Sequence, residues 1–252
     1  MIILREADEA DADDYVRLQK DISLGVFKID EESLSQTWTS MLKDNGRIAY
    51  TVLTEDTNDF CGYCAVKDVN ADKPEIEIEL LKKYHSKGIG FEVLYKMMTS
   101  LSAKDNISCF IALIEPDNYA SQKLMYKLGG VPASITKSFF LKEHQTEEFE
   151  NSNLHLLDDR LIQIAKDFGV EPKKLLSHIL VFDISSESLL KSGHRKSNGN
   201  IVADADRKIS VEKRRFYNRG FVRDVLKILE SNDNIDELKA SMISYLEEEL
   251  NG

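Results

Sequence analysis

The stretch that decides the fold of this chain is His85-Ser86-Lys87-Gly88-Ile89-Gly90. Residues 75–80, before it, alternate between glutamate and isoleucine or leucine, which is typical of a strand. Residues 91–101, after it, repeat apolar side chains at helical spacing. A strand, a glycine turn and a helix start bring backbone N–H groups and the positive end of the helix dipole to one point. The two glycines let a pyrophosphate approach the backbone, so the stretch predicts an anion site.

A second strand-to-helix unit follows the first. Residues 109–114 form an apolar run that indicates a buried strand, and Glu115-Pro116-Asp117-Asn118 turns the chain. Asp117 or Asn118 can cap a helix that stops at Gly129-Gly130.

These two units resemble the GNAT acyltransferase superfamily. The family pattern Q/R-x-x-G-x-G/A is matched from His85 to Gly90, with His85 at the Gln/Arg position. Asn118-x-x-Ser121, followed by residues 127–130, is similar to the branch that acetylates protein N-termini and related amines. The resemblance covers residues 1–140 and extends less closely to 185. It implies an α/β (α+β) fold with a mixed, mostly antiparallel sheet flanked by helices, and an acetyl-CoA-dependent N-acetyltransferase without a metal.

The resemblance also implies where acetyl-CoA binds. In this family two splayed strands hold the pantetheine arm between them, and here these strands end near Leu81 and Ile114. The resemblance assigns Asn118 to the far end of the arm and Ser121 to the thioester sulfur. The cofactor-binding residues expected from it are Leu80, Leu81, His85, Ser86, Lys87, Gly88, Ile89, Gly90, Asn118 and Ser121.

Two other readings of a glycine turn do not fit. A dinucleotide fingerprint needs a third glycine where Val93 stands. A phosphate-binding loop of the nucleotide-hydrolysing type needs Gly-Lys-Ser/Thr after four intervening residues, which this chain lacks.

The candidate catalytic residues are Glu75, Glu77, Ser121 and Tyr126. An amine acceptor is protonated near neutral pH, so a base must remove a proton before the nitrogen attacks. Glu75 and Glu77 resemble, by position, the acidic residues used in the family, and the alternative is that they only face solvent. The family's usual proton donor to the sulfur is a tyrosine seven residues after the asparagine, where Met125 stands here. Tyr126 is one residue off, which leaves Ser121, or no donor, as the alternatives.

Cys61 and Cys64 have the spacing of a redox or zinc pair. Residues 60–66 are expected to form a strand, in which residues three apart point to opposite faces. We therefore expect buried structural thiols. The histidines show no metal-type spacing, so no metal is expected.

Composition limits the partners. A net charge of −11 disfavours nucleic acid and anionic membranes and mildly favours cationic acceptors. No apolar run spans a membrane, and the N-terminus lacks a signal-type segment, so a cytoplasmic protein is expected.

The chain divides into a GNAT domain over 1–185, with a helical insertion at about 142–176, and a linker with a helical C-terminal region over 186–252. The C-terminal helices predict docking on the main domain or a homodimer; a basic nucleic-acid-binding arm is the weaker alternative. Phe27 and Trp38 are either acceptor contacts or core residues. The contrasting function is a catalytically silent acyl-CoA-binding module whose tail recognises a partner.

Overall fold

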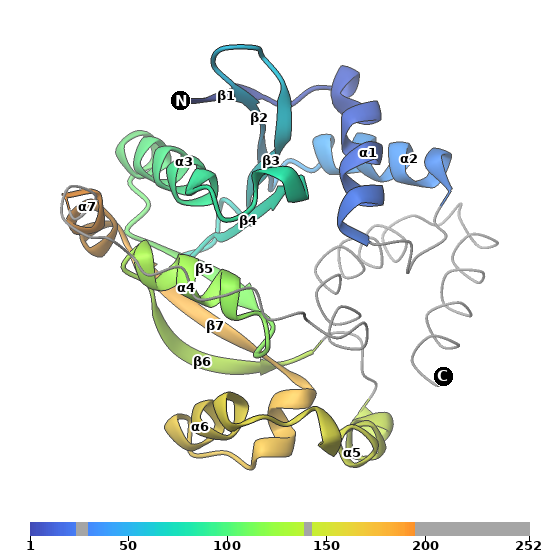
Figure 1. Ribbon diagram of the computed structural model, residues 1–252. Helices are drawn as coiled ribbons and strands as arrows, with labels where there is room; N and C mark the ends of the chain where they lie inside the picture. Colours follow the sequence, from blue (N-terminus) through green and yellow to red (C-terminus); the bar gives the residue numbers. More distant parts are fainter. Residues whose placement is uncertain (24–29, 139–142, 195–252) are drawn as a thin grey trace.

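The computed structural model describes residues 1–23, 30–138 and 143–194. These residues form one twisted sheet with helices packed on it (Figure 1). The strands are β1 (Ile2–Glu6), β2 (Ile48–Thr54), β3 (Phe60–Lys67), β4 (Glu75–Leu80), β5 (Cys109–Ile114), β6 (Val131–Lys137) and β7 (His178–Ser185).

The sheet has the order β1-β2-β3-β4-β5-β7-β6 in the described part of the chain. All neighbouring strands run antiparallel except β4 and β5, which are parallel and joined by a helical crossover. This mixed, mostly antiparallel sheet is the fold class that the sequence predicted.

The longer helices are α1 (Ala12–Ser23), α2 (Glu31–Leu42), α3 (Ile89–Asp105), α4 (Tyr119–Lys127), α5 (Glu143–Ser152), α6 (Asp159–Asp167) and α7 (Ser186–His194). Short 3-10 turns lie at η1 (Glu9–Asp11), η2 (Lys82–Tyr84), η3 (Leu154–Leu156) and η4 (Pro172–Leu176). Among the described residues, no helix has both the length and the apolar character needed to cross a membrane.

The helices form two groups, and each group packs on the sheet in its own hydrophobic cluster. The larger cluster joins the apolar faces of α3, α4 and α7 to the central strands, with Met98 and Phe182 fully buried. The smaller cluster joins α1 and α2 to β3, where Tyr15, Trp38 and Tyr63 pack ring against ring. Of the two aromatic candidates for acceptor contacts, Trp38 is therefore a core residue, 1 % exposed, while Phe27 lies outside the described residues.

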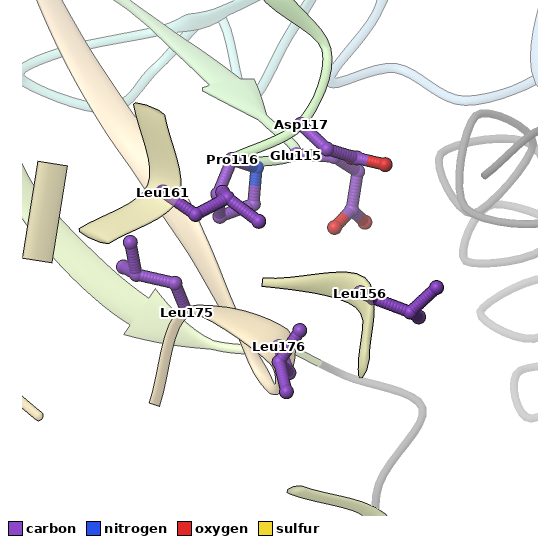
Figure 2. A pocket seen from close by; sticks show the side chains of 7 residues that line it. All are labelled: Glu115, Pro116, Asp117, Leu156, Leu161, Leu175 and Leu176. Carbon is purple, nitrogen blue, oxygen red and sulfur yellow. The ribbon is translucent and has the colours of Figure 1, made fainter. Parts of the chain in front are cut away.

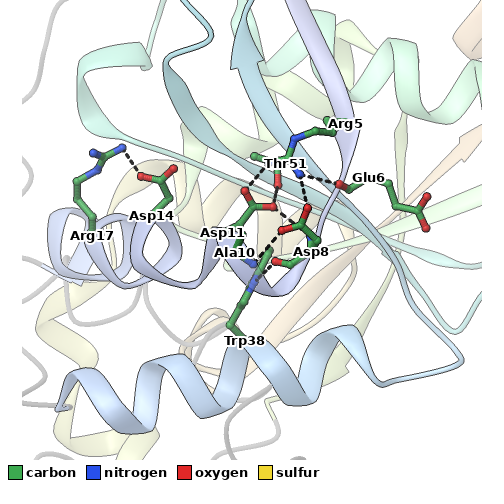
Figure 3. A network of polar contacts seen from close by, with 9 residues as sticks. All are labelled: Arg5, Glu6, Asp8, Ala10, Asp11, Asp14, Arg17, Trp38 and Thr51. Carbon is green, nitrogen blue, oxygen red and sulfur yellow. Dashed lines mark hydrogen bonds and ion pairs between the residues drawn. The ribbon is translucent and has the colours of Figure 1, made fainter.

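A polar network fixes the start of α1 against the sheet (Figure 3). The Asp11 carboxylate pairs with Arg5 and accepts a hydrogen bond of 2.6 Å from the Thr51 hydroxyl. The Asp8 carbonyl accepts a bond of 2.9 Å from the Trp38 indole, which ties α2 to the same point. Arg5 of β1, Thr51 of β2 and Trp38 of α2 thus all bind the turn before α1. These contacts fix the path of the chain between β1 and α1.

The segment between β6 and β7 carries α5, η3, α6 and η4, and it packs at the start of β7. Its centre is the Glu150 carboxylate, which is fully buried and bound by the Ser177 hydroxyl and the Lys174 ammonium. His178 donates from Nδ1 to the Lys174 carbonyl at 2.8 Å. Burial of the ring lowers the pKa of His178 below its usual value.

One boundary differs from that expected. The serine-rich stretch expected as a linker begins as α7, whose Leu189 is fully buried in the larger cluster. The rest of the expected helical C-terminal region, residues 195–252, lies outside the described residues.

Candidate functional site

The turn before α3 leaves the start of that helix open. Ser86 and Gly88 have positive φ angles of 57° and 80°, and no side chain accepts a hydrogen bond from the first turn of α3. The first N–H groups of a helix have no partner within the helix. A Cβ added at Gly88 would meet no atom of the described residues within 4 Å. Free helix N–H groups facing open space are the geometry that a bound pyrophosphate requires.

Gly90 brings this turn against α4. A Cβ at Gly90 would lie 3.3 Å from Leu124 Cδ2, 3.9 Å from Leu80 Cδ1 and 4.0 Å from Ile78 Cδ1. The first turn of α3 therefore packs closely on both α4 and β4. The start of α3, the middle of α4 and the end of β4 meet here.

β4 and β5 separate beside that place. Their register contains the single pair Glu75 and Ile111 in the described chain, with the Ile111 N–H donating to the Pro74 carbonyl at 2.9 Å. Backbone groups of successive strand residues point to alternate sides, so those of Ile78 and Leu80 face the gap. A strand edge facing a gap can bind an extended chain of amide groups.

Only one of the two expected backbone partners faces this gap. The Leu81 N–H donates to the Cys61 carbonyl of β3 at 2.8 Å, so it points away from β5. The Leu80 carbonyl points to the gap but accepts a hydrogen bond of 2.7 Å from His85 Nε2. His85 thus braces the end of β4 in this structure, a role that its place in the motif did not suggest.

Lysines surround the glycine turn. The Lys83 and Lys87 ammonium groups lie 4.8 Å and 5.7 Å from the centre of the ring of Tyr84, the last residue of η2. Both lysines are exposed. Their charges favour a polyanion at the start of α3.

The start of α4 is capped by Asn118. Its Oδ1 accepts a hydrogen bond of 3.1 Å from the N–H of Ser121, whose side chain is half-buried in the first turn. Met125 points into the core, 3 % exposed. Tyr126 is 55 % exposed and lies edge-on to Phe182, with ring centres 5.3 Å apart. The structure therefore turns Tyr126 to the outside of α4 and keeps Ser121 near the helix start.

Glu75 and Glu77 lie in a buried ion cluster on the face of β4 opposite to Ile78 and Leu80. Glu77 accepts from Arg47 at 2.8 Å and from the Tyr63 hydroxyl at 2.8 Å, and Lys67 lies 3.2 Å from Glu77 and 3.4 Å from Glu75. The carboxylates thus face cations and do not project into solvent. Burial, with the charge of Glu77, raises the pKa of Tyr63 well above its usual value.

Glu79 is the carboxylate nearest the end of β4, and sequence reasoning did not single it out. Gln19 of α1 is buried, 3 % exposed, and donates from Nε2 to Glu79 Oε2. Glu79 is half-buried. The signal was present in the sequence as the third glutamate of the alternation, but the pairing of Glu75 and Glu77 with Arg47 and Lys67 depends on how β3 and the start of β2 lie beside β4.

Cys61 and Cys64 both lie in the larger hydrophobic cluster, contrary to the expectation of opposite faces. The register of β2 and β3 shifts between Val52 and Leu53, opposite Cys61, and the extra residue resets the alternation of β3. Burial raises the pKa of the Cys64 thiol far above its usual value. Within the described residues, no group of three or more histidine, cysteine or acidic side chains could hold a metal.

Comparison with known proteins places the chain. Residues 1–131 match the family model described as an acetyltransferase (GNAT) domain. No curated protein matches the chain. Among solved structures, spermidine N-acetyltransferase from Vibrio cholerae, in complex with CoA and spermine, has a TM-score of 0.54 at 12% identity, over 75% of this chain and 98% of that one. Mycobacterium smegmatis RimJ, in complex with CoA-disulfide, has a TM-score of 0.54 at 13% identity, over 77% of this chain and 87% of that one.

Proposed function

Since the chain belongs to the GNAT acetyltransferase family, we propose that it transfers an acetyl group from acetyl-CoA to a primary amine of a small molecule or a protein N-terminus. The transfer takes place by direct attack in a ternary complex. The neighbour from Vibrio cholerae is a complex with CoA and spermine, the same two kinds of ligand as in this proposal.

The observation that carries the proposal is the uncapped start of α3 beside the gap between β4 and β5. The open space at Gly88 fits the pyrophosphate, and Ser86 to Gly90 supply the backbone N–H groups around it. The edge of β4 at Ile78 and Leu80 fits the amide groups of the pantetheine arm. The site residues therefore fit acetyl-CoA as co-substrate.

When bound, acetyl-CoA supplies a thioester carbon at which the C–N bond forms as the C–S bond breaks. Glu79 takes the proton that the ammonium must lose, because of the three glutamates of β4 it lies closest to the end of the strand, where β4 and β5 no longer pair. Gln19 fixes the direction of the Glu79 carboxylate. The hydroxyl of Ser121 donates a proton to the leaving sulfur, since Tyr126 is turned away from the helix start.

The test has two measurements on the full chain. Titration calorimetry with CoA measures binding, and release of CoA from acetyl-CoA is followed against a panel of amines and N-terminal peptides. We expect micromolar CoA binding and amine-dependent release that falls by about 10²-fold in Glu79→Gln. An absence of CoA binding would contradict the proposal, because the proposed reaction requires acetyl-CoA.

A second candidate is a catalytically silent acyl-CoA-binding module. Met125 stands where the family's proton-donating tyrosine is common, and Tyr126 does not replace it. This candidate predicts CoA binding with no amine-dependent release across the panel, so the same two measurements separate it from the enzyme.

A further inference from the structure

The His85 side chain is hydrogen-bonded to the edge of β4 that borders the gap. Its ring nitrogen Nε2 lies 2.7 Å from the Leu80 carbonyl oxygen. A carbonyl oxygen can only accept a hydrogen bond, so Nε2 carries the proton and donates it. Leu80 is the last residue of β4, and its carbonyl faces the gap because the next N–H, that of Leu81, is turned to Cys61 of β3. The His85 ring therefore occupies a backbone acceptor at the end of the gap.

The chain between Leu80 and His85 folds back, so that the ring reaches the strand. Residues 82–84 form η2, in which the His85 N–H donates to the Lys82 carbonyl at 3.0 Å. The Lys82 N–H donates to the Asp21 carboxylate at 2.6 Å, which ties this turn to α1. The backbone of the turn is thus held by bonds that do not involve the His85 ring.

The ring lies at the surface, where its movement disturbs little packing. His85 is exposed, whereas the neighbouring Tyr84 is partly buried against the hydrophobic clusters. The net contribution of a single hydrogen bond is modest, because water binds the separated donor and acceptor. Another donor can therefore displace the ring from the Leu80 carbonyl while the turn stays folded.

The pantetheine arm of CoA requires the same carbonyl. In the proposed site the arm lies along β4 as an added strand does, and the N–H groups of an added strand bind the carbonyls that face it. The carbonyls of Ile78 and Leu80 lie on this edge. The nitrogen of such a bond lies about 2.7–3.2 Å from the oxygen. His85 Nε2 is already within this distance of the Leu80 oxygen, so the ring and the arm compete for it.

We propose that His85 is a displaceable plug of the acyl-donor site. Without CoA its ring holds the Leu80 carbonyl and covers the end of an unpaired strand edge, which would otherwise be open to other chains. When CoA binds, the pantetheine arm takes the carbonyl and the ring turns out to solvent. His85 therefore lowers the affinity for CoA, which is the opposite of the cofactor-binding role expected from the motif. This inference rests on the proposed function, since it requires CoA in the gap.

The test compares two ligands that differ by the arm. The full chain is titrated calorimetrically with CoA and with 3′-phosphoadenosine 5′-diphosphate, which keeps the nucleotide and the diphosphate but lacks the arm. We expect His85→Ala to bind CoA about three- to tenfold more tightly than the wild type, because the arm no longer displaces a hydrogen bond. The affinity for the nucleotide should stay within about twofold of the wild-type value.

The matched control is His155→Ala, which removes another exposed histidine, on η3, and should leave both affinities unchanged. An unchanged or weaker affinity for CoA in His85→Ala, with thermal unfolding intact, would overturn the plug. An equal gain for both ligands would also overturn it, because the gain would then arise at the phosphates and not at the arm. Failure of the proposed function has a different signature, namely a wild-type chain that binds no CoA.

Discussion

Gly88 is the residue on which the proposed acyl-donor site depends most directly. Its φ of 80° lies in the left-handed region, which side chains rarely adopt, and its missing side chain leaves open space above the helix start. Ser86 also has a positive φ, so two residues of one turn hold the backbone N–H groups toward the same point.

We expect Gly88→Val to weaken CoA binding at least tenfold, about 1.4 kcal/mol, because the new side chain enters the space that the pyrophosphate needs. Calorimetry with CoA measures the loss. The matched control is Gly169→Val, since Gly169 also has a positive φ, 64°, and also faces open space, but lies at the end of α6. The control should lose stability by a similar amount and keep its CoA affinity; equal affinities in the two variants would place the pyrophosphate elsewhere.

Ser121 and Tyr126 separate two assignments of the proton donor. Ser121→Ala should lower kcat by about 10²-fold and leave the KM for acetyl-CoA nearly unchanged, because the interaction strengthens only in the transition state. Tyr126→Phe should be almost silent, since the ring lies on the outer side of α4 against Phe182. Steady-state kinetics on both variants decides; the reverse pattern would mean that α4 presents another face to the gap during turnover.

At the scale of elements, the gap between β4 and β5 and the segment between β6 and β7 serve different purposes. The gap exists because β5 pairs with β4 at one point only and then follows β7. The segment after β6 is anchored by charges that its own sequence supplies, with Glu150 buried between Lys174 and Ser177. His178 lies at the junction, half-buried, with the Glu150 carboxylate and the Lys174 and Lys137 ammonium groups around it.

Stability should fall as the pH drops from neutral toward 5, in part because of His178. Burial lowers its pKa in the folded chain below the ordinary value of 6.5, so the unfolded chain binds the proton more readily. The contribution is complete above about pH 6.5 and is lost as the pH falls toward the folded pKa. Urea unfolding at pH 5 and pH 7.5 should show a smaller pH effect in His178→Gln.

The matched control for this effect is His155→Gln, which removes an exposed histidine of the same segment. It should leave the pH dependence of the unfolding free energy close to that of the wild type. A His178→Gln variant with an unaltered pH dependence would show that the ring is not buried as a neutral group.

At the scale of the whole molecule, the GNAT core extends beyond the last strand. α7 packs on α3, with Leu189 fully buried and the Ser186 hydroxyl donating to the Ile107 carbonyl at 2.6 Å. The Ser188 carbonyl oxygen lies 2.7 Å from the position of a Cβ at Gly129, so α7 also lies close to the end of α4. These contacts join α7 to both helices that begin at the proposed site.

A chain ending at residue 194 should therefore keep its CoA binding, whereas one ending at 185 should be less stable than the chain ending at 194 by about 2–5 kcal/mol, because it vacates the site of Leu189. Urea unfolding and calorimetry measure the two. We also expect the chain ending at 194 to differ from the full chain in association state, because we propose that residues 195–252 form the homodimer contact; light scattering checks this. An identical mass per particle in both chains would contradict that proposal.

The sequence by itself determined the strands at 75–80 and 109–114, the glycine turn at the start of α3 and a helix cap at Asp117 or Asn118, of which the structure has Asn118. Each of these depends on local causes, namely side-chain periodicity, backbone freedom at glycine and a side-chain oxygen near free N–H groups. That Met125 stands at the position of the expected tyrosine was also visible in the sequence alone.

Only the tertiary structure decided that Glu75 and Glu77 face cations, because Arg47 and Lys67 come from elsewhere in the chain. The same holds for the bulge at Cys61, which depends on pairing with β2, and for the Leu81 N–H, which turns to β3. The small pocket lined by Glu115, Leu161 and Leu175, among others, also joins residues that lie far apart in the sequence (Figure 2). Contacts between distant segments are set by how sheet layers and helices pack, and no local pattern records them.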